Sequence, residues 1–478
     1  MNYCNAIETS KRWKVSVQTV LKYCNLGMIE GAYKEGRSWN IPIDADYPGR
    51  SVKPNGFKFI DLFCGIGGFH QAMSQLGGSC VFACDINANC REVYKENFCP
   101  NGEFLLYGDI NDAINDNVIP QFDVLCGGFP CQTFSKAGLQ NGFNIVTKEN
   151  GESDERGQLF YRIIDILKRH QECKFIVLEN VRNLADKVEN WNVICKELKE
   201  QGFIITERPV IESPHNFGIP QVRERVFILG VRESAFDNRR LLPEGFLTRE
   251  VLNIDSHKKV IKEKDNALPS ILEPSPEKYL VSDDINELLL IWEEFRANVT
   301  GLASPFWIHK AGIGIYDREE YYQDPTIDFL SMPEWKKKLV MKSRIMYENN
   351  TRFIDDWIKK YDMRSRNMLH QKFEWNCGTD CSSIKDGIIQ IRQSGIRVKR
   401  PNYFPSLVVM KNTPIVWDKT WEHFRFITPR EAAKLQSFSA NYKFGNIDSV
   451  TYEQLGNSVN VELVRIFAEE LFKFGRKN

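Results

Sequence analysis

The chain has 478 residues, a length that predicts two or three domains rather than one hydrophobic core. With 42% apolar and 26% charged residues and no low-complexity tract, its composition is that of a globular protein. No apolar run reaches the length of a membrane span, and the first residues lack the layout of a signal peptide, so we expect the protein in the cytoplasm.

The formal net charge is zero, which by itself does not favour a nucleic-acid binder. The charges are unevenly distributed, however, because residues 283–320 form an acidic stretch and residues 336–400 a basic one. This asymmetry is compatible with one basic face that contacts phosphates, and nearly as well with an ordinary solvated surface.

The thirteen cysteines are an odd number, and several of them lie in apolar runs, as Cys64, Cys84 and Cys126 do. We therefore expect reduced thiols rather than a disulfide framework. Cys377 and Cys381 are spaced like half of a metal site, but a second half with histidine partners is missing from the sequence, so no metal is expected.

Residues 1–50 form a unit of their own. Ser16 is a candidate N-cap for a helix over 15–23, and residues 29–42 predict a small hairpin. This pattern resembles the winged helix-turn-helix of excisionase and MerR-type proteins, which implies contact with DNA. The alternative is a structural cap on the larger domain. Residues 46–56 are rich in proline and glycine and predict a linker.

From residue 57 to residue 231, short apolar runs alternate with helical stretches. Strands are expected at 59–63, 80–84, 122–125 and 175–178, with helices around 71–73 and 160–164. The alternation predicts an α/β domain with a doubly wound, mostly parallel sheet. Residues 232–424 lose this rhythm and predict a mixed α+β region. After them, a helix opens at Thr428-Pro429, and an amphipathic helix follows from Val461.

The segment Asp61–Phe69 directly follows the first strand and holds three glycines, which let a backbone turn approach a ligand closely. A dinucleotide fingerprint would need a further glycine at position 70, where this chain has His70. Asp85, at the end of the second strand, is placed to hold ribose hydroxyls, and Asp109, after the next strand, to hold an adenine amino group. The sequence thus predicts an adenosine-bearing cofactor without a pyrophosphate.

Residues 127–132 read Gly-Gly-Phe-Pro-Cys-Gln and place Cys131 in a loop after the third apolar strand. Open α/β sheets bind ligands beyond the ends of their strands, and an ionised cysteine is a strong nucleophile. Taken alone, Cys131 is as well explained as a small buried hydrophobe.

Together, these segments resemble the DNA cytosine-5 methyltransferases of bacterial restriction-modification systems. The matching motifs occur in the family's usual order at residues 61–69, 128–132, 179–181, 221–225, 430–436 and 456–459. The resemblance implies a Rossmann-like class I methyltransferase fold and S-adenosylmethionine as the cofactor. It implies four parts: a helix-turn-helix module (1–50), the catalytic domain (57–231), a target-recognition domain (232–424) and a segment that completes the catalytic domain (425–478).

The resemblance also implies a role for each site residue. Cys131 attacks cytosine C6, Glu179 hydrogen-bonds N3 and the exocyclic amine, Arg225 holds O2 or a phosphate, and Arg223 helps to order the loop. The expected cofactor-binding residues are Phe63, Gly65, Gly67, Asp85, Ile86, Asp109, Ile110, Pro130, Leu159, Asn457, Ser458 and Val459.

A stacked base is out of reach of this chemistry, so the target cytosine must be flipped out of the duplex. Candidate DNA contacts near the nucleophile are Gln132, Ser135 and Arg156. In the recognition region they are Arg392, Gln393 and Arg397, since arginine reads guanine and glutamine reads adenine in the major groove. The alternative for the latter group is a strand pair that binds phosphates.

We therefore expect an enzyme that methylates cytosine C5 in a short duplex sequence, acting as a monomer on DNA in a bacterial cytoplasm, with a companion endonuclease possible in the same system. One alternative is methylation of tRNA by the same fold. Another is a transcriptional regulator that acts chiefly through residues 1–50. A nicotinamide oxidoreductase is disfavoured by His70 and by the Pro-Cys loop.

Overall fold

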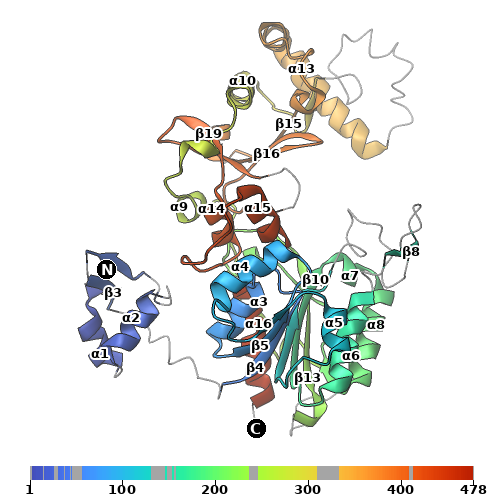
Figure 1. Ribbon diagram of the computed structural model, residues 1–478. Helices are drawn as coiled ribbons and strands as arrows, with labels where there is room; N and C mark the ends of the chain where they lie inside the picture. The colour runs from blue at the N-terminus through green and yellow to red at the C-terminus, as the bar shows by residue number, and fades with distance from the viewer. Residues whose placement is uncertain are drawn as a thin grey trace. The chain divides into compact units, whose positions relative to one another are not determined.

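The structure is a computed structural model, shown in Figure 1. The residues that it describes are 3–13, 16–25, 29, 31–36, 38–43, 45, 56–130, 146–147, 153–154, 158–235, 246–308, 333–379, 381–407 and 413–476. The chain divides into two compact units. Unit 1 comprises Met1–Ile219, Arg223–Val260 and Ala433–Asn478, and unit 2 comprises Pro220–Val222 and Ile261–Ala432. The domain limits expected after residues 231 and 424 stay predictions.

The N-terminal part of unit 1 is a small module with its own core. Its elements are β1 (Tyr3–Cys4), α1 (Ala6–Trp13), α2 (Val17–Asn25), β2 (Tyr33–Glu35) and β3 (Ser38–Pro42). The strands form an antiparallel sheet in the order β1-β3-β2, and the two helices pack against each other. Trp13, Val20 and Ile41 are buried in the core. The expected helix and hairpin are confirmed, whereas β1 and α1 were not expected.

The main sheet of unit 1 has eight strands among the described residues, in the order β11-β13-β10-β7-β4-β5-β6, with β12 paired to β13. The strands are β4 (Lys58–Leu62), β5 (Ser79–Cys84), β6 (Leu105–Tyr107), β7 (Val124–Gly127), β10 (Phe175–Val181), β11 (Phe203–Ile205), β12 (Val210–Glu212) and β13 (Arg225–Arg232). Strands β6, β5, β4, β7 and β10 are parallel, while β13 runs antiparallel to its three neighbours. The sheet is therefore mixed, and its parallel part contains all four expected strands.

Helices cover both faces of this sheet. They are α3 (Gly68–Gln75), α4 (Ala88–Phe98), α5 (Ile110–Asn115), α6 (Leu159–Arg169), α7 (Asn183–Asp186), α8 (Val188–Glu200), α15 (Asp448–Asn457) and α16 (Val461–Arg476). In Figure 1, α3 and α16 lie on one face, and α5, α6 and α8 lie on the other. Apolar side chains of the latter three helices, such as Ile114, Ile163 and Ile194, join the strands in one buried core.

Short local signals fix where the helices next to the site begin. The side chain of Asn87 accepts hydrogen bonds from the backbone N–H groups of Asn89 and Cys90 and so caps α4. Asp109 caps α5 in the same way, through Asn111. Both caps follow directly on parallel strands, so these two helix starts lie at the carboxyl edge of the sheet.

Unit 2 is built around a six-stranded sheet in the order β14-β15-β17-β16-β18-β19. Its elements are α9 (Leu268–Ile271), α10 (Asp283–Asn298), β14 (Phe306–Trp307), α13 (Glu334–Lys360), β15 (Lys372–Asn376), β16 (Ile388–Arg392), β17 (Gly395–Lys399), β18 (Ile415–Asp418) and β19 (His423–Phe426), followed by α14 (Pro429–Leu435), which crosses into unit 1. Trp292 on α10 stacks on Phe373 of β15 and contacts Trp357 on α13. The helices and the sheet therefore share one aromatic core.

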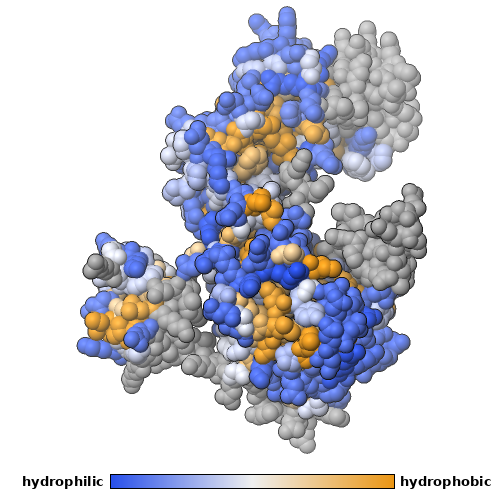
Figure 2. All heavy atoms as spheres, viewed as in Figure 1, coloured by the Kyte–Doolittle hydropathy of each residue, from blue (hydrophilic) through white to orange (hydrophobic). Residues whose placement is uncertain are grey.

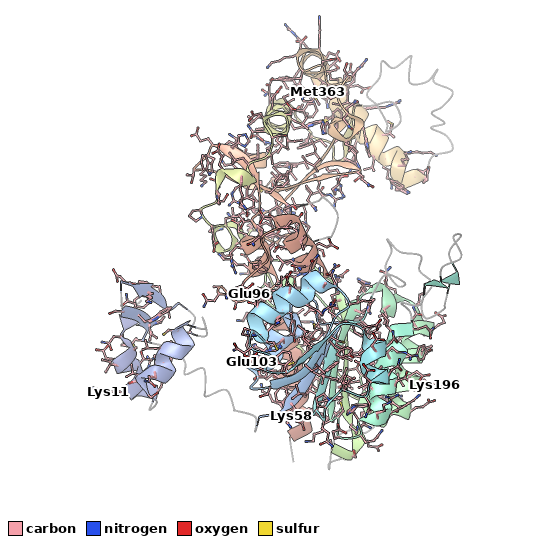
Figure 3. All side chains as sticks on the ribbon, viewed as in Figure 1. Lys11, Lys58, Glu96, Glu103, Lys196 and Met363 are labelled. Atoms are coloured by element: carbon pink, nitrogen blue, oxygen red, sulfur yellow. The ribbon has the colours of Figure 1, made fainter. Side chains whose placement is uncertain are left out.

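The side of unit 1 that α5 and α8 cover is polar (Figure 2). Figure 2 shows hydrophilic side chains over α5 and α8, and Figure 3 shows Lys196 on the outer side of α8. A two-stranded sheet, β8 (Val146–Thr147) with β9 (Ser153–Asp154), completes the described strands. Among the described residues, no helix is both long enough and apolar enough to cross a membrane. The twelve described cysteines are free thiols.

Candidate active site

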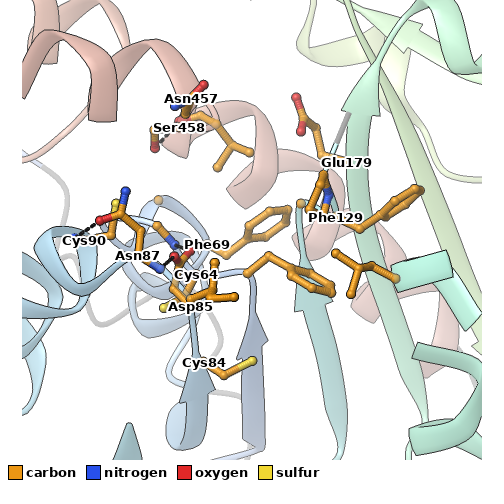
Figure 4. Close-up of a pocket in the computed structure, with 18 of the residues that line it drawn as sticks. Cys64, Phe69, Cys84, Asp85, Asn87, Cys90, Phe129, Glu179, Asn457 and Ser458 are labelled. Atoms are coloured by element: carbon orange, nitrogen blue, oxygen red, sulfur yellow. Dashed lines mark hydrogen bonds between the residues drawn. The ribbon is translucent and has the colours of Figure 1, made fainter. Parts of the chain in front are cut away.

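A cavity of about 420 Å³ lies in unit 1 where β4, β5, β7 and β10 end (Figure 4). Its volume falls in the range of small-molecule sites. Fourteen of the residues that the sequence singled out line it, and they come from eight separate stretches of the chain. These are Phe63, Gly65, Asp85, Ile86, Asp109, Ile110, Pro130, Leu159, Glu179, Arg223, Arg225, Asn457, Ser458 and Val459.

The glycine-rich turn between β4 and α3 needs its glycines for two different reasons. Gly65 has φ +51°, and a Cβ atom there would meet no atom within 4 Å, so the backbone lies open to the cavity. At Gly67, with φ +82°, a Cβ would lie 2.2 Å from the Phe98 ring. Gly67 is not among the residues that line the cavity, so the structure shows a packing role for this expected cofactor contact.

Asp85 follows β5 and holds the turn in place. One carboxylate oxygen accepts the Gly65 N–H at 2.8 Å, and the other accepts the Asn87 N–H at 2.8 Å. Burial raises the pKa of Asp85, against the effect of these backbone hydrogen bonds and of Arg91. A carboxylate oxygen can accept more than one hydrogen bond, so Asp85 retains acceptor capacity toward the cavity.

His70, which stands where a dinucleotide site would have glycine, is part of a buried network behind the turn. Its Nδ1 lies 2.8 Å from the Tyr94 hydroxyl, which donates to Asp61 at 3.2 Å. The imidazole stacks on the Phe98 ring with 4.0 Å between centroids. Burial lowers the pKa of His70 to about 3, so the ring is neutral and supports the turn by packing.

Glu179 extends the site to the other side of the cavity, as Figure 4 shows. The sequence predicts that the strand ends at Glu179, but β10 continues to Val181 because Asn180 and Val181 still pair with the antiparallel strand β13. Glu179 is 7% exposed. Its position within a paired strand fixes the backbone from which the carboxyl group projects.

The Glu179 carboxyl group has one close cation and an unused acceptor. Nε of Arg225 lies 2.8 Å from Oε1, yet this oxygen forms no hydrogen bond with any described residue. Burial raises the pKa of Glu179, and Arg225 and Arg223 only partly oppose this effect. The site therefore presents a buried carboxyl group that can be protonated and can bind a polar ligand.

Asn180 has a structural role that the sequence reasoning missed. Its Nδ2 donates a buried hydrogen bond of 3.0 Å to the carbonyl oxygen of Phe129. This bond joins β10 to the loop after β7, two residues before Cys131. The signal that could have revealed it is a polar residue between Glu179 and Val181 in an otherwise apolar strand.

Arg223 connects the site to the C-terminal segment. Its Nη2 donates to the carbonyl oxygens of Gly456 and Ser458, at 2.9 and 2.5 Å, and its backbone N–H donates to Ser213. Its described bonds therefore hold the segment after α15 that borders the cavity, and the expected role of Arg223 in ordering the nucleophile loop stays a prediction. Cys131, Gln132, Ser135 and Arg156 lie outside the described residues.

Comparison with known proteins identifies the chain's family. The family model for C-5 cytosine-specific DNA methylase matches residues 57–473. The chain belongs to this family. It is a DNA (cytosine-5)-methyltransferase, and its cofactor is S-adenosylmethionine.

Two named methyltransferases resemble this one along most of their length, and a third resembles it over about half of its length. Type II methyltransferase M.AluI from Cellulosimicrobium cellulans is 30% identical over 87% of this chain and 91% of its own. M.HgiCI from Herpetosiphon aurantiacus is 30% identical over 87% of this chain and 98% of its own. M.HpaII from Haemophilus parainfluenzae is 43% identical over 39% of this chain and 49% of its own.

The residues of the cavity fit this cofactor. The open backbone at Gly65 leaves room for a ligand in direct contact with the turn. Asp85 and Asp109 supply carboxylates for hydroxyl and amino groups, and Ile86 and Leu159 supply apolar surface beside them. Ile86 is 78% exposed, so its side chain is accessible to a ligand in the cavity.

Proposed function

We propose that the methyltransferase acts on a flipped cytosine in duplex DNA through a transient covalent bond between Cys131 and C6 of the base. The observation that carries this proposal is the buried Glu179 carboxyl group, which lines the same cavity as Pro130 and whose pKa is raised by burial. Cys131 follows Pro130 directly in the chain. A carboxyl group and a thiol at one cavity are the pair that activation of a pyrimidine ring requires.

In the proposed mechanism, the Cys131 thiolate adds to C6 and the electrons of the C5–C6 double bond shift through C4 toward N3. The Glu179 carboxyl group donates a proton or hydrogen bond at N3, which leaves C5 nucleophilic. S-adenosylmethionine supplies the methyl group that C5 acquires. N3 then returns its proton to Glu179, and loss of the C5 proton to a base restores the C5–C6 double bond and expels Cys131 as a thiolate.

The other side chains position these groups. Asn180 holds the carbonyl of Phe129 and so fixes the chain just before the nucleophile. Arg225 is placed beside Glu179 to contact the base O2 or a phosphate, and Arg223 holds the Gly456–Ser458 backbone beside the cofactor. The proposed cofactor contacts are Phe63, Gly65, Asp85, Ile86, Asp109, Ile110, Pro130, Leu159, Asn457, Ser458 and Val459, all of which line the cavity.

A base inside a stacked duplex cannot enter such a cavity, so the target nucleotide must leave the stack at a cost of roughly a few kcal/mol. We propose that the loop after Cys131, with Gln132 and Ser135, closes over the flipped base and that Arg156 contacts a phosphate. In this proposal the loop contributes to catalysis only after DNA has bound.

The covalent step is tested with duplex DNA in which 5-fluorocytosine replaces cytosine, because fluorine at C5 cannot leave as the proton does. The wild-type protein should form a complex with this DNA that survives denaturation when S-adenosylmethionine is present. Cys131→Ser should form none, yet should bind the duplex nearly as well as the wild type. Full turnover by Cys131→Ser would refute the role of this cysteine.

We propose further that unit 2 recognises a short DNA sequence and that the enzyme is the modification half of a restriction-modification system in a bacterial cytoplasm. The similarity to proteins named type II methyltransferases supports this. Bisulfite sequencing of DNA from cells that express the enzyme should show methylcytosine at one short sequence. A companion endonuclease would then be blocked at that sequence.

The N-terminal module supports a second proposed activity, DNA binding by residues 1–50 as a winged helix-turn-helix that regulates the enzyme's own promoter. Two helices joined to an antiparallel hairpin around a separate core are the parts that this class of module needs. Deletion of residues 1–50 should abolish promoter binding and preserve methylation. Loss of methylation on every substrate would instead show a structural role for the module.

A further inference from the structure

One face of the sheet in unit 2 is not used for the aromatic core. Strand residues alternate between the two faces, so Phe373, Ile396 and Ile389 lie on the face that packs with Trp292 and the other helix residues. The positions between them form rows across β15, β17 and β16 on the opposite face. In one row, Glu374 pairs with Arg397, which pairs with Gln390.

Glu374 is the centre of a charged cluster on this face. Its two carboxylate oxygens receive Nζ of Lys372 at 2.8 Å, Nη2 of Arg392 at 2.7 Å and Nε of Arg397 at 2.6 Å. Glu374 is 7% exposed, whereas the side chains of Arg392 and Arg397 are 21% and 32% exposed. Although burial would raise the pKa of Glu374, the hydrogen bonds from Lys372 and Arg397 hold it below the ordinary value.

The cluster keeps unused hydrogen-bonding groups. Arg397 donates to Glu374 through Nε. Its two Nη groups donate to no described residue and stay available to a ligand. Gln390, next to Arg397 in the same row, is 7% exposed, and its amide forms no hydrogen bond with a described residue. Three cations share one carboxylate, which leaves a formal charge of +2. The face therefore presents fixed donors and an excess of positive charge.

A glycine keeps the strands beneath these groups close together. Gly395 has φ +111°, and a Cβ atom there would lie 2.7 Å from Cβ of Lys372. Gly395 also pairs with Arg392. It therefore lies between Lys372 of β15 and Arg392 of β16, in the row of residues next to that of Glu374. Without a side chain at Gly395, all three cations can approach the one carboxylate.

We propose that Glu374 is a positioning residue for target recognition: it orients Arg397 so that both Nη groups donate to N7 and O6 of a guanine in the recognition sequence, with the Gln390 amide beside them. This inference rests on the proposed function of unit 2 in reading DNA. A phosphate contact requires a cation of any orientation, whereas a base edge requires two donors in a fixed plane. The anchored Nε and the two open Nη groups of Arg397 match the second requirement.

The test begins with the methylated sequence as determined for the wild-type enzyme. Duplexes then carry 7-deazaguanine at one guanine at a time, which removes the N7 acceptor and leaves base pairing intact. At one recognition guanine, this change should lower kcat/KM of the wild type about 10- to 100-fold, chiefly through KM. In Glu374→Gln and Arg397→Lys, the same duplex should not lower kcat/KM further. The first variant no longer orients the Arg397 guanidinium group, and the second lacks it.

Matched variants separate this effect from a general loss of charge or fold. Arg366→Lys and Glu287→Gln alter another arginine–glutamate pair of unit 2, whose atoms are 3.2 Å apart, and should keep the full 7-deazaguanine penalty. Arg397→Lys keeps the positive charge, so a phosphate contact would survive in it. If Glu374→Gln does not fold, Arg397→Lys decides the question alone.

The possible failures are distinguishable. A wild-type enzyme that methylates no duplex contradicts the proposed function itself. A wild-type enzyme that methylates a sequence without guanine, or variants that keep the full penalty at every recognition guanine, overturn the role of Glu374 and Arg397 while the proposed function stands.

Discussion

Glu179 in unit 1 and Glu374 in unit 2 are equally buried, at 7% exposure, and each lies beside arginine side chains. Their surroundings give them opposite acidities. Burial raises the pKa of Glu179, since Arg225 and Arg223 only partly offset it. Around Glu374 the same desolvation is outweighed by hydrogen bonds from Lys372 and Arg397 and by the charge of Arg392, and the pKa lies below its ordinary value.

The comparison shows that burial by itself does not define the role of a carboxyl group. What differs is the number of cations that contact its oxygens: Glu179 has Arg225 at 2.8 Å, whereas Glu374 has Lys372 at 2.8 Å, Arg392 at 2.7 Å and Arg397 at 2.6 Å. A buried carboxyl group with one cation beside it can still exchange a proton with a ligand in its cavity. A carboxyl group that three cations contact stays ionised and holds its partners in place.

The largest expected effect is on catalysis. Glu179→Gln should lower kcat by about 10²- to 10⁴-fold, because an amide cannot protonate the ring. Single-turnover methylation measures the loss, and binding of duplex DNA should change little. Glu200→Gln, on the outer surface of α8 near Lys196, is the control and should retain full activity. A Glu179→Gln enzyme with normal kcat would show that this carboxyl group has no part in the reaction.

A smaller effect should follow from loosening the loop before the nucleophile. Asn180→Ala removes the hydrogen bond to Phe129 and should lower kcat about 10- to 100-fold, because small errors in the position of a nucleophile are costly. The 5-fluorocytosine trapping rate reports the same defect directly. Asn97→Ala, which loses surface hydrogen bonds to Val93 and Lys443, serves as the control. Equal trapping rates in the two variants would contradict a positioning role for Asn180.

Replacing each of the two glutamates by glutamine should change the free energy of unfolding in opposite directions at neutral pH. Glu374→Gln should lower the free energy of unfolding by about 2 kcal/mol, since a charge that receives several hydrogen bonds is lost. Glu179→Gln should raise it by about 1 kcal/mol, because a carboxyl group that is costly to ionise is replaced by a neutral amide. Unfolding is followed by calorimetry and by fluorescence of Trp292 and Trp357, which lie in unit 2. If both substitutions raised or both lowered the free energy of unfolding, the proposed difference between the two carboxyl groups would be wrong.

The pH dependence of this contrast follows from the two pKa shifts. The folded pKa of Glu374 is depressed, so its stabilisation is complete above the ordinary value of 4.5 and is lost as the pH falls through the lower folded pKa. The folded pKa of Glu179 is raised, so stability from its protonated form is complete below 4.5 and is lost as the pH rises through the folded pKa. The free energy of unfolding of the wild type and of each variant is measured from pH 3 to pH 8, an interval of about five units around the ordinary glutamate pKa. The difference between variant and wild type should change with pH in opposite directions for the two glutamates.

A further effect on stability, of similar size, concerns the turn between β16 and β17. Gly395→Ala should cost about 1–3 kcal/mol of stability, because φ +111° is unfavourable for alanine and the new Cβ meets Lys372. Gly301→Ala is the matched control, with φ +67° and no atom within 4 Å of the Cβ position, and should cost less. Equal losses would show that the close approach of β15 and β17 does not depend on this glycine.

Much of the fold was predictable from local patterns. The four strands expected in the parallel sheet and the helices near Met73 and Ile163 are all present, because buried strands and amphipathic helices have distinct periodicities. The antiparallel strand β13 and the whole sheet of unit 2 were not predicted in detail. Strand β13 pairs with β10, and β14 with β15, through backbone hydrogen bonds between segments far apart in the sequence, which local periodicity does not encode.

The sequence by itself determined which groups we propose to react, because the glycine-rich turn and the Pro130-Cys131 pair are contiguous segments whose chemistry is local. Only the tertiary structure decided which distant groups face each other: Arg225 beside Glu179, Asn180 on Phe129, and Arg397 on Glu374. The register of paired strands sets these contacts, and a shift of one residue would turn every such side chain to the opposite face. The acidity of each carboxyl group depends on that register, since its neighbours supply the charges and hydrogen bonds that move the pKa.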